Sequence, residues 1–559
     1  MHYKNFTTAT YAPAGYLHDN SIEQIKADIE KAGKYVKLDK IYLETYRADI
    51  LIDREKMDAI IAVFKEKGLK LSGGITTATA GTLMGAMCYT SPETRKLLGE
   101  VAYYTAELFD EVMLDDFYFT NCRCEACIKA KGDRDWASFR LELLQDYSEN
   151  VILKNARAAR ADVNVIIKFP NWYDSFVNCG YNLEQASPVF DMVYTGTETR
   201  DQTYTQQNLA RYLSYFLPRL IENIKHGKNG GGWYDLFECS LEDYLQQAYL
   251  TLFAKCKEQM MFCLPLLSNL PVYTAAAGAA YDELDPIMEK IGNPVGIACY
   301  EPYHKNDNHT GERHLYDFLG MLGIPLEPYP QYPADAPVVL LIESAARDCK
   351  IVDKIKATMN NGGNVFVTSG LYKALEGKIE DIYPITITGK KVITNSFKSN
   401  NFGMNNGTFE TSRIDITIPH VDYNTNDVWM MSAGMTSHYS HPILLCGTYG
   451  AGKMYVLTIP DSPDSLYHLP SGVLSCLRRE LDQPVTLECG GGIGLFTYDN
   501  NTFILQSFLT RPEKVRVHLK EPADLDLLSG VGRYTLTKIS DTLYEVFILP
   551  GRYSIFKIN

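Results

Sequence analysis

The sequence predicts an α/β chain that begins with a (β/α)8 TIM barrel, continues into a flavodoxin-like α/β domain and ends in a small C-terminal β-sandwich. Three observations along the 559 residues favour this class. Short apolar runs alternate with amphipathic, helix-length stretches through the first half of the chain. A proline-rich segment interrupts that pattern at 325–337, and alternating apolar and polar residues follow from residue 483 onward.

The apolar runs of the first half predict a parallel sheet, because helix-length stretches separate them and parallel strands need such crossovers. Helices are expected at 21–35, 54–68 and 136–160. An open, doubly wound sheet is the structural alternative. The even number of strands and the polar residue at almost every strand end favour the closed barrel. The eight expected strands are 6–14, 41–47, 70–77, 111–117, 164–170, 191–198, 231–238 and 259–266.

The second half contains two further patterns. The segment PLEPYPQYPADAP (325–337) is typical of a hinge between domains. After it, VVLLIESA (338–345) has the pattern of a fully buried strand, and residues 350–370 have that of a helix, a glycine turn and a strand. Asn500 and Asn501 mark a hairpin turn in the C-terminal part. We therefore expect a barrel over 1–325, a flavodoxin-like domain over 326–480 and a β-sandwich over 481–559.

The composition, 46% hydrophobic and 22% charged, is ordinary for a globular protein. A net charge of −14 argues against nucleic acid or an anionic membrane as the main partner. The sequence has no signal-peptide pattern and no run of 18 apolar residues. Thirteen cysteines, an odd number without a secretory signal, are typical of reduced thiols, so a cytoplasmic location is expected. The glycine-rich stretches at 361–363 and 490–494 lack nucleotide-binding spacing, so no organic cofactor is expected.

Polar and aromatic residues follow nearly every predicted strand of the barrel. The C-terminal strand ends of such a barrel form its active site, so these side chains are expected to converge. Several carboxylates facing aromatic rings suit cleavage of a glycosidic bond, where one carboxylic acid protonates the leaving oxygen and a second attacks the anomeric carbon or activates water. The alternative for any single carboxylate is that it caps a helix or pairs with an arginine. The residues are Glu44, Tyr46, Arg47, Asp115, Asp116, Tyr118, Lys168, Asn171, Trp172, Glu198, Arg200, Trp233, Tyr234, Asp235, Glu238, Tyr300, Glu301 and His304.

A cysteine cluster follows the fourth strand in the stretch NCRCEAC, which contains Cys122, Cys124 and Cys127. Structural zinc requires four ligands in a tetrahedral shell. Cys88, in the loop after the third strand, is the candidate for the fourth ligand, because neighbouring barrel loops lie close together. A shell of four cysteines is closed, so such a zinc ion would brace the loops without taking part in chemistry. A set of free reduced thiols is the alternative.

The order of the parts and two local stretches resemble glycoside hydrolase family 42, the β-galactosidase-type enzymes of clan A. The stretch CYTSPETR (88–95) is similar to the family's cysteine-containing loop, and NCRCEACIKAKGDRDWASFR (121–140) is similar to its Cys-x-Cys-x-x-Cys cluster. VFDMVYTGTETR (189–200) is more loosely similar to the family's sixth strand. The resemblance implies a TIM barrel, an α/β trimerisation domain, a small β-sandwich, a homotrimer and zinc bound by Cys88, Cys122, Cys124 and Cys127.

The catalytic residues implied by this resemblance depart from the clan's pattern. Clan A enzymes place Asn-Glu at the end of strand 4, where this chain has Asp115 and Asp116. The resemblance implies Glu238 at the end of strand 7 as the nucleophile and Asp116 as the acid/base, with Asp115 in the place of the asparagine. An alternative assignment makes Asp116 the nucleophile and Glu198 on strand 6 the acid, as in several α-glycosidase barrels. The sequence does not choose between the two.

We therefore expect a retaining, exo-acting glycoside hydrolase on a small saccharide. The expected catalytic residues are Asp115, Asp116, Glu198 and Glu238. A sugar-binding barrel without catalytic activity is the alternative, motivated by the Asp-Asp pair. His304 and His309 are read as part of a polar loop, with a second metal site as the other reading. The expected substrate-binding residues are Glu44, Tyr46, Arg47, Tyr118, Lys168, Trp172, Arg200, Trp233 and Glu301.

Overall fold

A computed structural model describes residues 2–305, 311–399, 408–530 and 536–559. The chain divides into two compact units. The first comprises Met1–Leu209, Leu213–Glu289 and Tyr303–His309. The second comprises Ala210–Tyr212, Lys290–Pro302 and Thr310–Asn559. Each unit is described by itself below.

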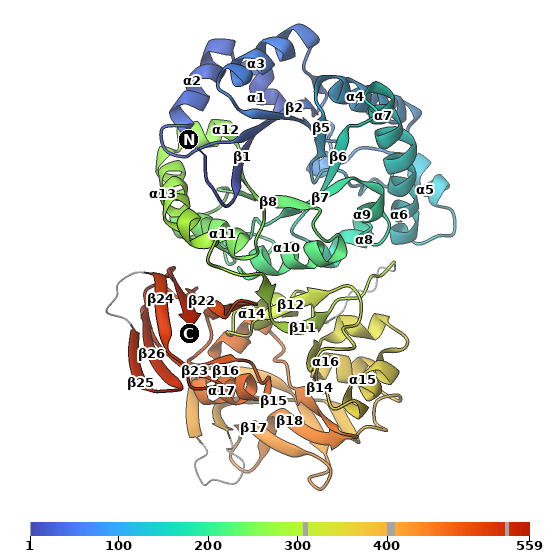
Figure 1. The fold of residues 1–559 in the computed structure, drawn as a ribbon. Coiled ribbons are helices and arrows are strands. Elements are labelled where there is room, and N and C mark those ends of the chain that lie inside the picture. The colour runs from blue at the N-terminus through green and yellow to red at the C-terminus, as the bar shows by residue number, and fades with distance from the viewer. Residues whose placement is uncertain (1, 306–310, 400–407, 531–535) are drawn as a thin grey trace. The chain divides into compact units, whose positions relative to one another are not determined.

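The first unit is a closed barrel of parallel strands surrounded by helices (Figure 1). The sheet runs in the order β1-β9-β8-β7-β6-β5-β4-β2, and β1 also pairs with β2, which closes it. This closure excludes the open sheet, and all eight expected strands are present. They are β1 (Thr7–Ala12), β2 (Lys40–Arg47), β4 (Lys70–Ile75), β5 (Glu111–Leu114), β6 (Asn164–Phe169), β7 (Met192–Gly196), β8 (Asn229–Asp235) and β9 (Glu258–Phe262); β3 (Ile50–Leu51) pairs with the end of β2.

The helices of the barrel begin where the sequence supplies a capping side chain. Ser21, Asp53 and Asp135 each accept a hydrogen bond from a backbone N–H in the first turn of the helix that follows. The expected helix at 136–160 is continuous but changes pitch at a π-helical segment. The helices are α1 (Ala14–Asp19), α2 (Ile22–Ala32), α3 (Arg54–Glu66), α4 (Pro92–Leu108), α5 (Glu125–Lys131), α6 (Trp136–Tyr147), π-helical η2 (Ser148–Leu153), α7 (Lys154–Ala159), α8 (Phe176–Cys179), α9 (Ala186–Val189), α10 (Leu213–Ile224), α11 (Leu241–Phe253), α12 (Leu264–Asn269) and α13 (Pro271–Met288), with 3-10 turns η1 (Leu83–Gly85) and η3 (Tyr173–Ser175).

Large side chains fill the interior of the barrel. Tyr11, Tyr42, Met113 and Trp233 belong to one buried cluster. A filled interior leaves the mouth at the carboxyl ends of the strands as the place for a ligand, as in other barrels of this type.

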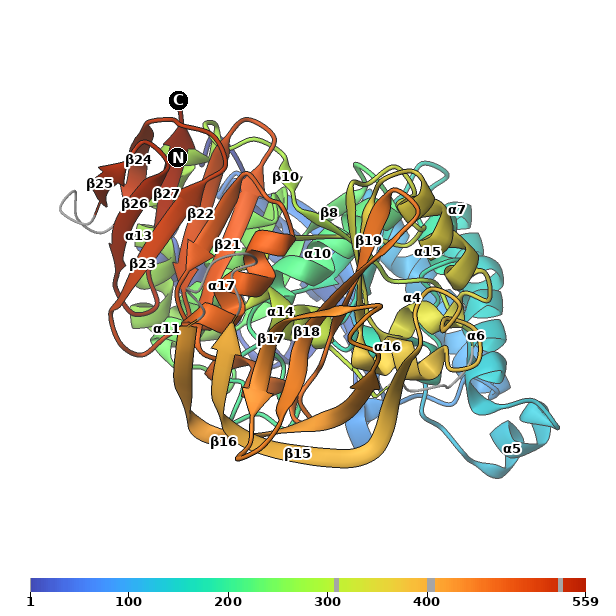
Figure 2. The ribbon, with the colours of Figure 1, turned by 90° about the horizontal axis from the view of Figure 1, so that it is seen from below.

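The second unit begins with a mixed sheet whose parallel part has the flavodoxin order. Its strands run β12-β11-β13-β14-β19, which is the order 2-1-3-4-5 along this part of the chain. Four antiparallel strands, inserted between β14 and β19, extend the sheet, and β15 and β16 are its longest strands (Figure 2). The elements are β11 (Ile297–Tyr300), α14 (Leu315–Gly320), β12 (Leu326–Tyr329), β13 (Val338–Leu341), η4 (Glu343–Arg347), α15 (Ile351–Asn360), β14 (Asn364–Thr368), α16 (Ser369–Ala374), β15 (Ile385–Ser399), β16 (Thr408–Tyr423), β17 (Trp429–Met435), β18 (Ser440–Tyr449), β19 (Gly452–Leu457), η5 (Pro463–His468) and α17 (Ser471–Glu480).

The proline-rich segment at 325–337 is not the hinge that its composition indicates. It contains β12, the strand at one edge of the sheet, and β11 of the same sheet precedes it in the chain. Pro328 lies within β12. Proline has no N–H to donate to a sheet, so it is tolerated at such an edge. The second unit therefore begins near Lys290, well before the expected boundary at 325.

The C-terminal part is a β-sandwich of two antiparallel sheets, as predicted. One sheet runs β20-β23-β26-β25 and the other β10-β21-β22-β27-β24, and apolar residues of both form one buried core. The predicted turn at Asn500 and Asn501 joins β21 to β22, with Asn501 in the left-handed region at φ 63°. The strands are β10 (Pro294–Val295), β20 (Val485–Glu488), β21 (Ile493–Tyr498), β22 (Thr502–Ser507), β23 (Glu513–Leu519), β24 (Leu525–Gly530), β25 (Leu536–Ser540), β26 (Leu543–Ile548) and β27 (Tyr553–Ile558).

Candidate active site

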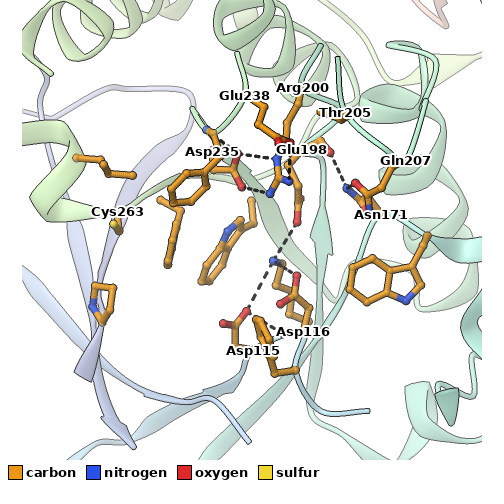
Figure 3. A pocket seen from close by; sticks show the side chains of 18 of the residues that line it. Asp115, Asp116, Asn171, Glu198, Arg200, Thr205, Gln207, Asp235, Glu238 and Cys263 are labelled. Atoms are coloured by element: carbon orange, nitrogen blue, oxygen red, sulfur yellow. Dashed lines mark hydrogen bonds and ion pairs between the residues drawn. The ribbon is translucent and has the colours of Figure 1, made fainter. Parts of the chain in front are cut away.

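A cavity of about 1130 Å³ lies at the mouth of the barrel (Figure 3). Each of the eight barrel strands contributes to its wall from its carboxyl end or from the segment that follows it, from Pro13 after β1 to Leu266 after β9. Charged side chains from five of these strand ends converge in it. They are Arg47, Asp115, Asp116, Lys168, Glu198, Arg200, Asp235 and Glu238.

The ammonium group of Lys168, at the end of β6, is the centre of this cluster. Its Nζ lies 2.7 Å from Oδ2 of Asp116 and 3.3 Å from Oε1 of Glu198. It also lies 3.7 Å from Oδ1 of Asp115. The Lys168 side chain is only 2% exposed, so these contacts are formed almost without competing water. One buried cation therefore connects carboxylates from the ends of β5 and β7.

A second cation, Arg47 at the end of β2, holds Asp115 from the other side. Its guanidinium donates to Oδ2 of Asp115 at 2.7 Å and to both oxygens of Glu44 at 2.9 Å. Asp115 also accepts a hydrogen bond from the backbone N–H of Asp116 at 2.7 Å. These contacts fix the orientation of the Asp115–Asp116 pair.

A third cation lies nearer the rim of the cavity. Arg200 donates to both oxygens of Asp235, at 3.0 and 2.7 Å, which is the bidentate geometry that guanidinium and carboxylate groups favour. The Glu238 side chain is 47% exposed, and its Oε2 lies 4.0 Å from Arg200. Glu238 therefore belongs to the outer part of the site and has a weaker ionic contact than Asp116 or Glu198.

Glu198 combines burial with an unsatisfied oxygen. Its Oε1 contacts Lys168, whereas Oε2 is buried and has no hydrogen-bond partner among the described residues. Its backbone carbonyl accepts a hydrogen bond from the side chain of Asn171 at 2.6 Å, and Asn171 also exchanges hydrogen bonds with Gln207. A buried oxygen without a partner is costly unless a ligand or a proton satisfies it.

Burial and the neighbouring charges move the pKa values of this cluster in different directions. Burial raises the pKa of Asp116 to about 7 and raises that of Glu198 as well, because a carboxylate loses its hydration inside the protein. Lys168 opposes both shifts, and the negative charge of Asp115 adds to the shift at Asp116. Burial acts on Asp115 in the same way, but Lys168 and Arg47 outweigh it and hold the pKa of Asp115 below its usual range. The pKa values of Asp116 and Glu198 are therefore raised, whereas that of Asp115 is lowered.

Most of the expected site residues lie in the wall of this cavity. Asp115, Asp116, Glu198 and Glu238 are all there. So are Asn171 and Asp235, which the sequence also places at strand ends. Of the expected substrate-binding residues, the wall contains Arg47, Lys168, Trp172, Arg200 and Trp233.

Four expected substrate-binding residues lie elsewhere among the described parts of the chain. Glu44 is fully buried and accepts hydrogen bonds from Tyr11, Ala14 and Arg47. Its carboxylate therefore holds the Arg47 guanidinium in place. Tyr46 is buried and donates to Asp49. Tyr118 is buried and contacts Ser148. Glu301 directly follows β11 in the second unit, where it accepts hydrogen bonds from Ser344 and Arg347. These assignments are corrected because none of the four side chains lines the cavity.

The wall also contains residues that the sequence did not point to. The loop after β7 contributes Tyr204 to Gln207, and the ends of β8 and β9 contribute Phe237, Phe262 and Cys263. The glutamine-rich run DQTYTQQ directly after the sixth strand was the available signal for the loop. The apolar residues carried no signal, because phenylalanine after a strand is equally common in cores.

The four predicted cysteines lie together. The sulfur atoms of Cys88, Cys122, Cys124 and Cys127 are all within 4.8 Å of one another. The Sγ of Cys88 lies 3.6 Å from that of Cys124 and 3.7 Å from that of Cys127. With zinc–sulfur bonds of about 2.3 Å, tetrahedral ligands lie about 3.8 Å apart, so the group fits a tetrahedral zinc ion. Of the two histidines considered for a second metal, His309 lies outside the described residues.

Comparison with known proteins identifies the family. Residues 1–284 match the family model described as "Probable glycosyl hydrolase, catalytic domain". Residues 292–462 match the second domain of the uncharacterised protein SSO3021, and residues 484–531 match "Probable glycosyl hydrolase, C-terminal domain". SSO3021 itself, from Saccharolobus solfataricus, is 25% identical, and the match covers 96% of this chain and 95% of the relative.

Solved structures share the fold along the whole chain. Gan42B, a GH42 β-galactosidase of G. stearothermophilus, has a TM-score of 0.63 at 12% identity and covers 100% of this chain and 99% of its own. The α-L-fucosidase isoenzyme 2 of Paenibacillus thiaminolyticus has a TM-score of 0.65 at 12% identity, with 100% of both chains covered. Within the described residues, no helix has the length and apolarity required to cross a bilayer. The family match over more than half of the chain shows that this protein belongs to the probable glycosyl hydrolases and is a glycosidase, with the fold of the GH42 enzymes that its sequence resembles.

Proposed function

We propose that this glycosidase is a retaining enzyme in which Asp116 is the nucleophile and Glu198 is the general acid/base. The observation that carries the proposal is the shared contact of both carboxylates with Lys168, at 2.7 and 3.3 Å. Two oxygens in contact with the same nitrogen are within about 6 Å of one another, which suits the separation of about 5–5.5 Å in retaining enzymes better than the 6.5–9.5 Å of inverting ones.

The position of Lys168 favours this distribution of roles. Carboxyls this close titrate as a unit, and near neutral pH such a unit retains one proton. The ammonium group lies nearer to Asp116 than to Glu198, so the negative charge is more stable on Asp116. Because the pKa of Asp116 is about 7, about half of the molecules are ionised there near neutral pH, and in these the proton lies on Glu198, whose unpartnered Oε2 is available to donate it. This gives an ionised nucleophile and a neutral acid in the same site.

The reaction then proceeds in two displacements. The Asp116 carboxylate attacks the anomeric carbon and forms an ester, while the bond to the leaving oxygen breaks and that oxygen takes the proton from Glu198. The ionised Glu198 next removes a proton from water, and the resulting hydroxide attacks the anomeric carbon. The ester bond breaks, the free sugar leaves, and Asp116 and Glu198 return to their starting states.

The other charged groups hold this pair in place and bind hydroxyls. Arg47 and Lys168 keep Asp115 ionised, so its carboxylate can accept a hydrogen bond from a sugar hydroxyl. The Arg200–Asp235 pair offers a fixed donor and acceptor nearer the rim. The wall draws on all eight strand ends, and such a ring favours a pocket for a terminal sugar and therefore exo-action on a small oligosaccharide or glycoside.

The experiment is a screen of aryl glycosides, starting with β-D-galactosides and α-L-fucosides because two proteins of similar fold carry those activities. Wild type is compared with Asp116→Gly, Glu198→Ala and Glu238→Gln. Azide should rescue both of the first two variants, giving a glycosyl azide of inverted configuration with Asp116→Gly and of retained configuration with Glu198→Ala.

Glu238→Gln tests the other assignment, in which Glu238 is the nucleophile and Asp116 is the acid/base. We expect it to keep at least about a tenth of wild-type kcat, because the Glu238 side chain is 47% exposed and its ionic contact is a long one of 4.0 Å to Arg200. Loss of activity in Glu238→Gln, with azide rescue to an inverted product in Glu238→Gly, would instead assign the nucleophile to Glu238 and the acid/base role to Asp116. Binding of sugars without hydrolysis of any glycoside would favour the silent sugar-binding barrel.

The cysteine cluster supports two further proposals. The four thiols would hold a structural zinc ion, which braces the loop after β5 that follows Asp116. Thiolates in such a set require a reducing compartment, in keeping with the expected cytoplasmic location. Zinc is tested by metal analysis of the purified chain.

The homotrimer rests on the family resemblance and is tested by mass measurement in solution.

A further inference from the structure

The cavity has two unlike walls. On the side of β6 and β7, its lining offers hydrogen-bonding groups from Asn171, Arg200 and the loop that ends at Gln207. On the side of β8, β9 and β1, the carboxylates of Asp235 and Glu238 face Arg200. Apart from these and the Cys263 thiol, the lining there is formed by the rings of Phe237 and Phe262 with other apolar side chains. The apolar group comprises Phe237, Phe262, Trp233, Pro13, Pro265 and Leu266.

Three of these rings form a continuous row from the reacting centre to the rim. Lys168 Nζ lies over the Trp233 ring, 4.1 Å from its centroid. Trp233 stacks on Phe262 with centroids 5.1 Å apart, and Phe262 lies 6.1 Å from Phe237. The exposed fraction of the side chains rises along the row, from 3% at Trp233 to 42% at Phe237. The row thus leads outward from the site where the glycosidic bond would break.

This row is poorly suited to a second sugar. A sugar in a binding site needs hydrogen-bond partners for its hydroxyls, since polar groups left unpaired on burial cost free energy. Apart from the Trp233 indole, the side chains of the apolar group have no hydrogen-bond donor or acceptor. An alkyl or aryl group, in contrast, would gain free energy by covering Phe262 and Phe237.

We propose that this apolar row is the leaving-group subsite and that the natural substrates are glycosides with an apolar aglycone. The inference rests on the proposed function, because it needs the bond to be cleaved beside Lys168. A terminal sugar occupies the polar side of the cavity, and the alkyl or aryl group on its anomeric oxygen lies along Phe262 toward Phe237. The apolar group therefore leaves through the rim.

The test is a series of methyl, hexyl and octyl glycosides of the sugar that reacts fastest in the aryl-glycoside screen, all below their critical micelle concentrations. Full burial of one methylene corresponds to a gain of about fourfold in binding, so partial burial of the chain should raise kcat/KM by about tenfold or more from methyl to octyl. In Phe237→Ala this gain should shrink to about threefold or less.

The matched control is Tyr204→Ala, which also truncates an exposed aromatic residue of the wall but outside the row. It should keep the full gain with chain length. Equal kcat/KM for methyl and octyl glycosides in the wild type would overturn the inference, as would a gain that Phe237→Ala leaves intact or a clear preference for disaccharides. If no glycoside of any sugar is hydrolysed, the proposed function itself fails, and the inference fails with it.

Discussion

Replacing Lys168 by methionine tests the proposed arrangement of charges most directly. The substitution keeps most of the volume of the side chain and removes the cation that lies 2.7 Å from Asp116 and 3.3 Å from Glu198. Breaking a buried ion pair by removing one partner costs about 3–5 kcal/mol, because the remaining charge is buried without compensation. At 1.36 kcal/mol for each unit, the pKa of Asp116 should rise by about two to four units.

The consequence for activity follows from the ionised fraction of Asp116. Burial already raises the pKa of Asp116 to about 7, so near pH 7 about half of the molecules hold the working anion. A rise of two units would leave about one hundredth of the molecules in that state, so kcat/KM at pH 7 should fall about 50-fold or more. Activity should recover as the pH is raised, because the anion then forms despite the missing cation.

The assay is kcat/KM for an aryl glycoside between pH 5 and pH 10. The acid limb of the profile should move to higher pH in Lys168→Met and stay close to its wild-type position in Lys168→Arg, which keeps the charge. Lys129→Met, at an exposed lysine of the same barrel, is the control for loss of a lysine as such. An acid limb that stays in place in Lys168→Met would refute the idea that Lys168 keeps Asp116 ionised.

Three further predictions concern separate parts of the chain. Cys124→Ser should lower the zinc content from about one ion per chain to near zero and speed tryptic cleavage around α5. Equal zinc content in the variant and the wild type would show that the four cysteines do not form the zinc site. Arg200→Lys should lower kcat/KM by about 10-fold or more, because lysine cannot make the bidentate contact to Asp235, and unchanged kinetics would show that the pair is only structural. Burial raises the pKa of Glu312 to about 7, so the folded state binds more protons there than the unfolded chain between about pH 4.5 and 7, and unfolding free energy falls as pH rises through that range. Between pH 5 and pH 8, the unfolding free energy of the wild type, measured by denaturant titration, should therefore fall by up to about 3 kcal/mol more than that of Glu312→Gln. An equal fall in the unfolding free energy of both proteins would contradict this.

The barrel was predictable because its strands are buried runs of apolar residues separated by capped helices. The helices expected to start at 21, 54 and 136 begin within one residue of those positions, where Ser21, Asp53 and Asp135 cap them. The start of the second unit was not predictable, because β11 follows the barrel without a change in composition and the prolines of the expected hinge fit an edge strand. Local patterns report which residues form strands, but the order of strands in a sheet depends on pairing between distant segments.

The site was predictable as a set of strand ends, but its inner arrangement was not. Glu44 and Asp115 both contact Arg47, yet only Asp115 reaches the cavity wall, and the sequence carries no signal for that difference. Similarly, Glu198 and Glu238 are equally good candidates in the sequence. The contact of Lys168 with Glu198, and the exposure of Glu238, depend on side-chain directions that only the folded barrel supplies.

The wall of the cavity is built from eight strands, so substitutions that affect the reaction and substitutions that affect the choice of substrate fall on different strands. The groups proposed to break the bond come from β5, β6 and β7, three neighbouring strands whose side chains are tied to one another through Lys168. The apolar row comes from β8 and β9, and Trp233 connects it to Lys168 in that centre. Substitutions in Phe237 or Leu266 can therefore retune which molecules are accepted without altering how protons are handled. Relatives with this barrel can accordingly diverge in substrate one loop at a time while the reaction itself is preserved.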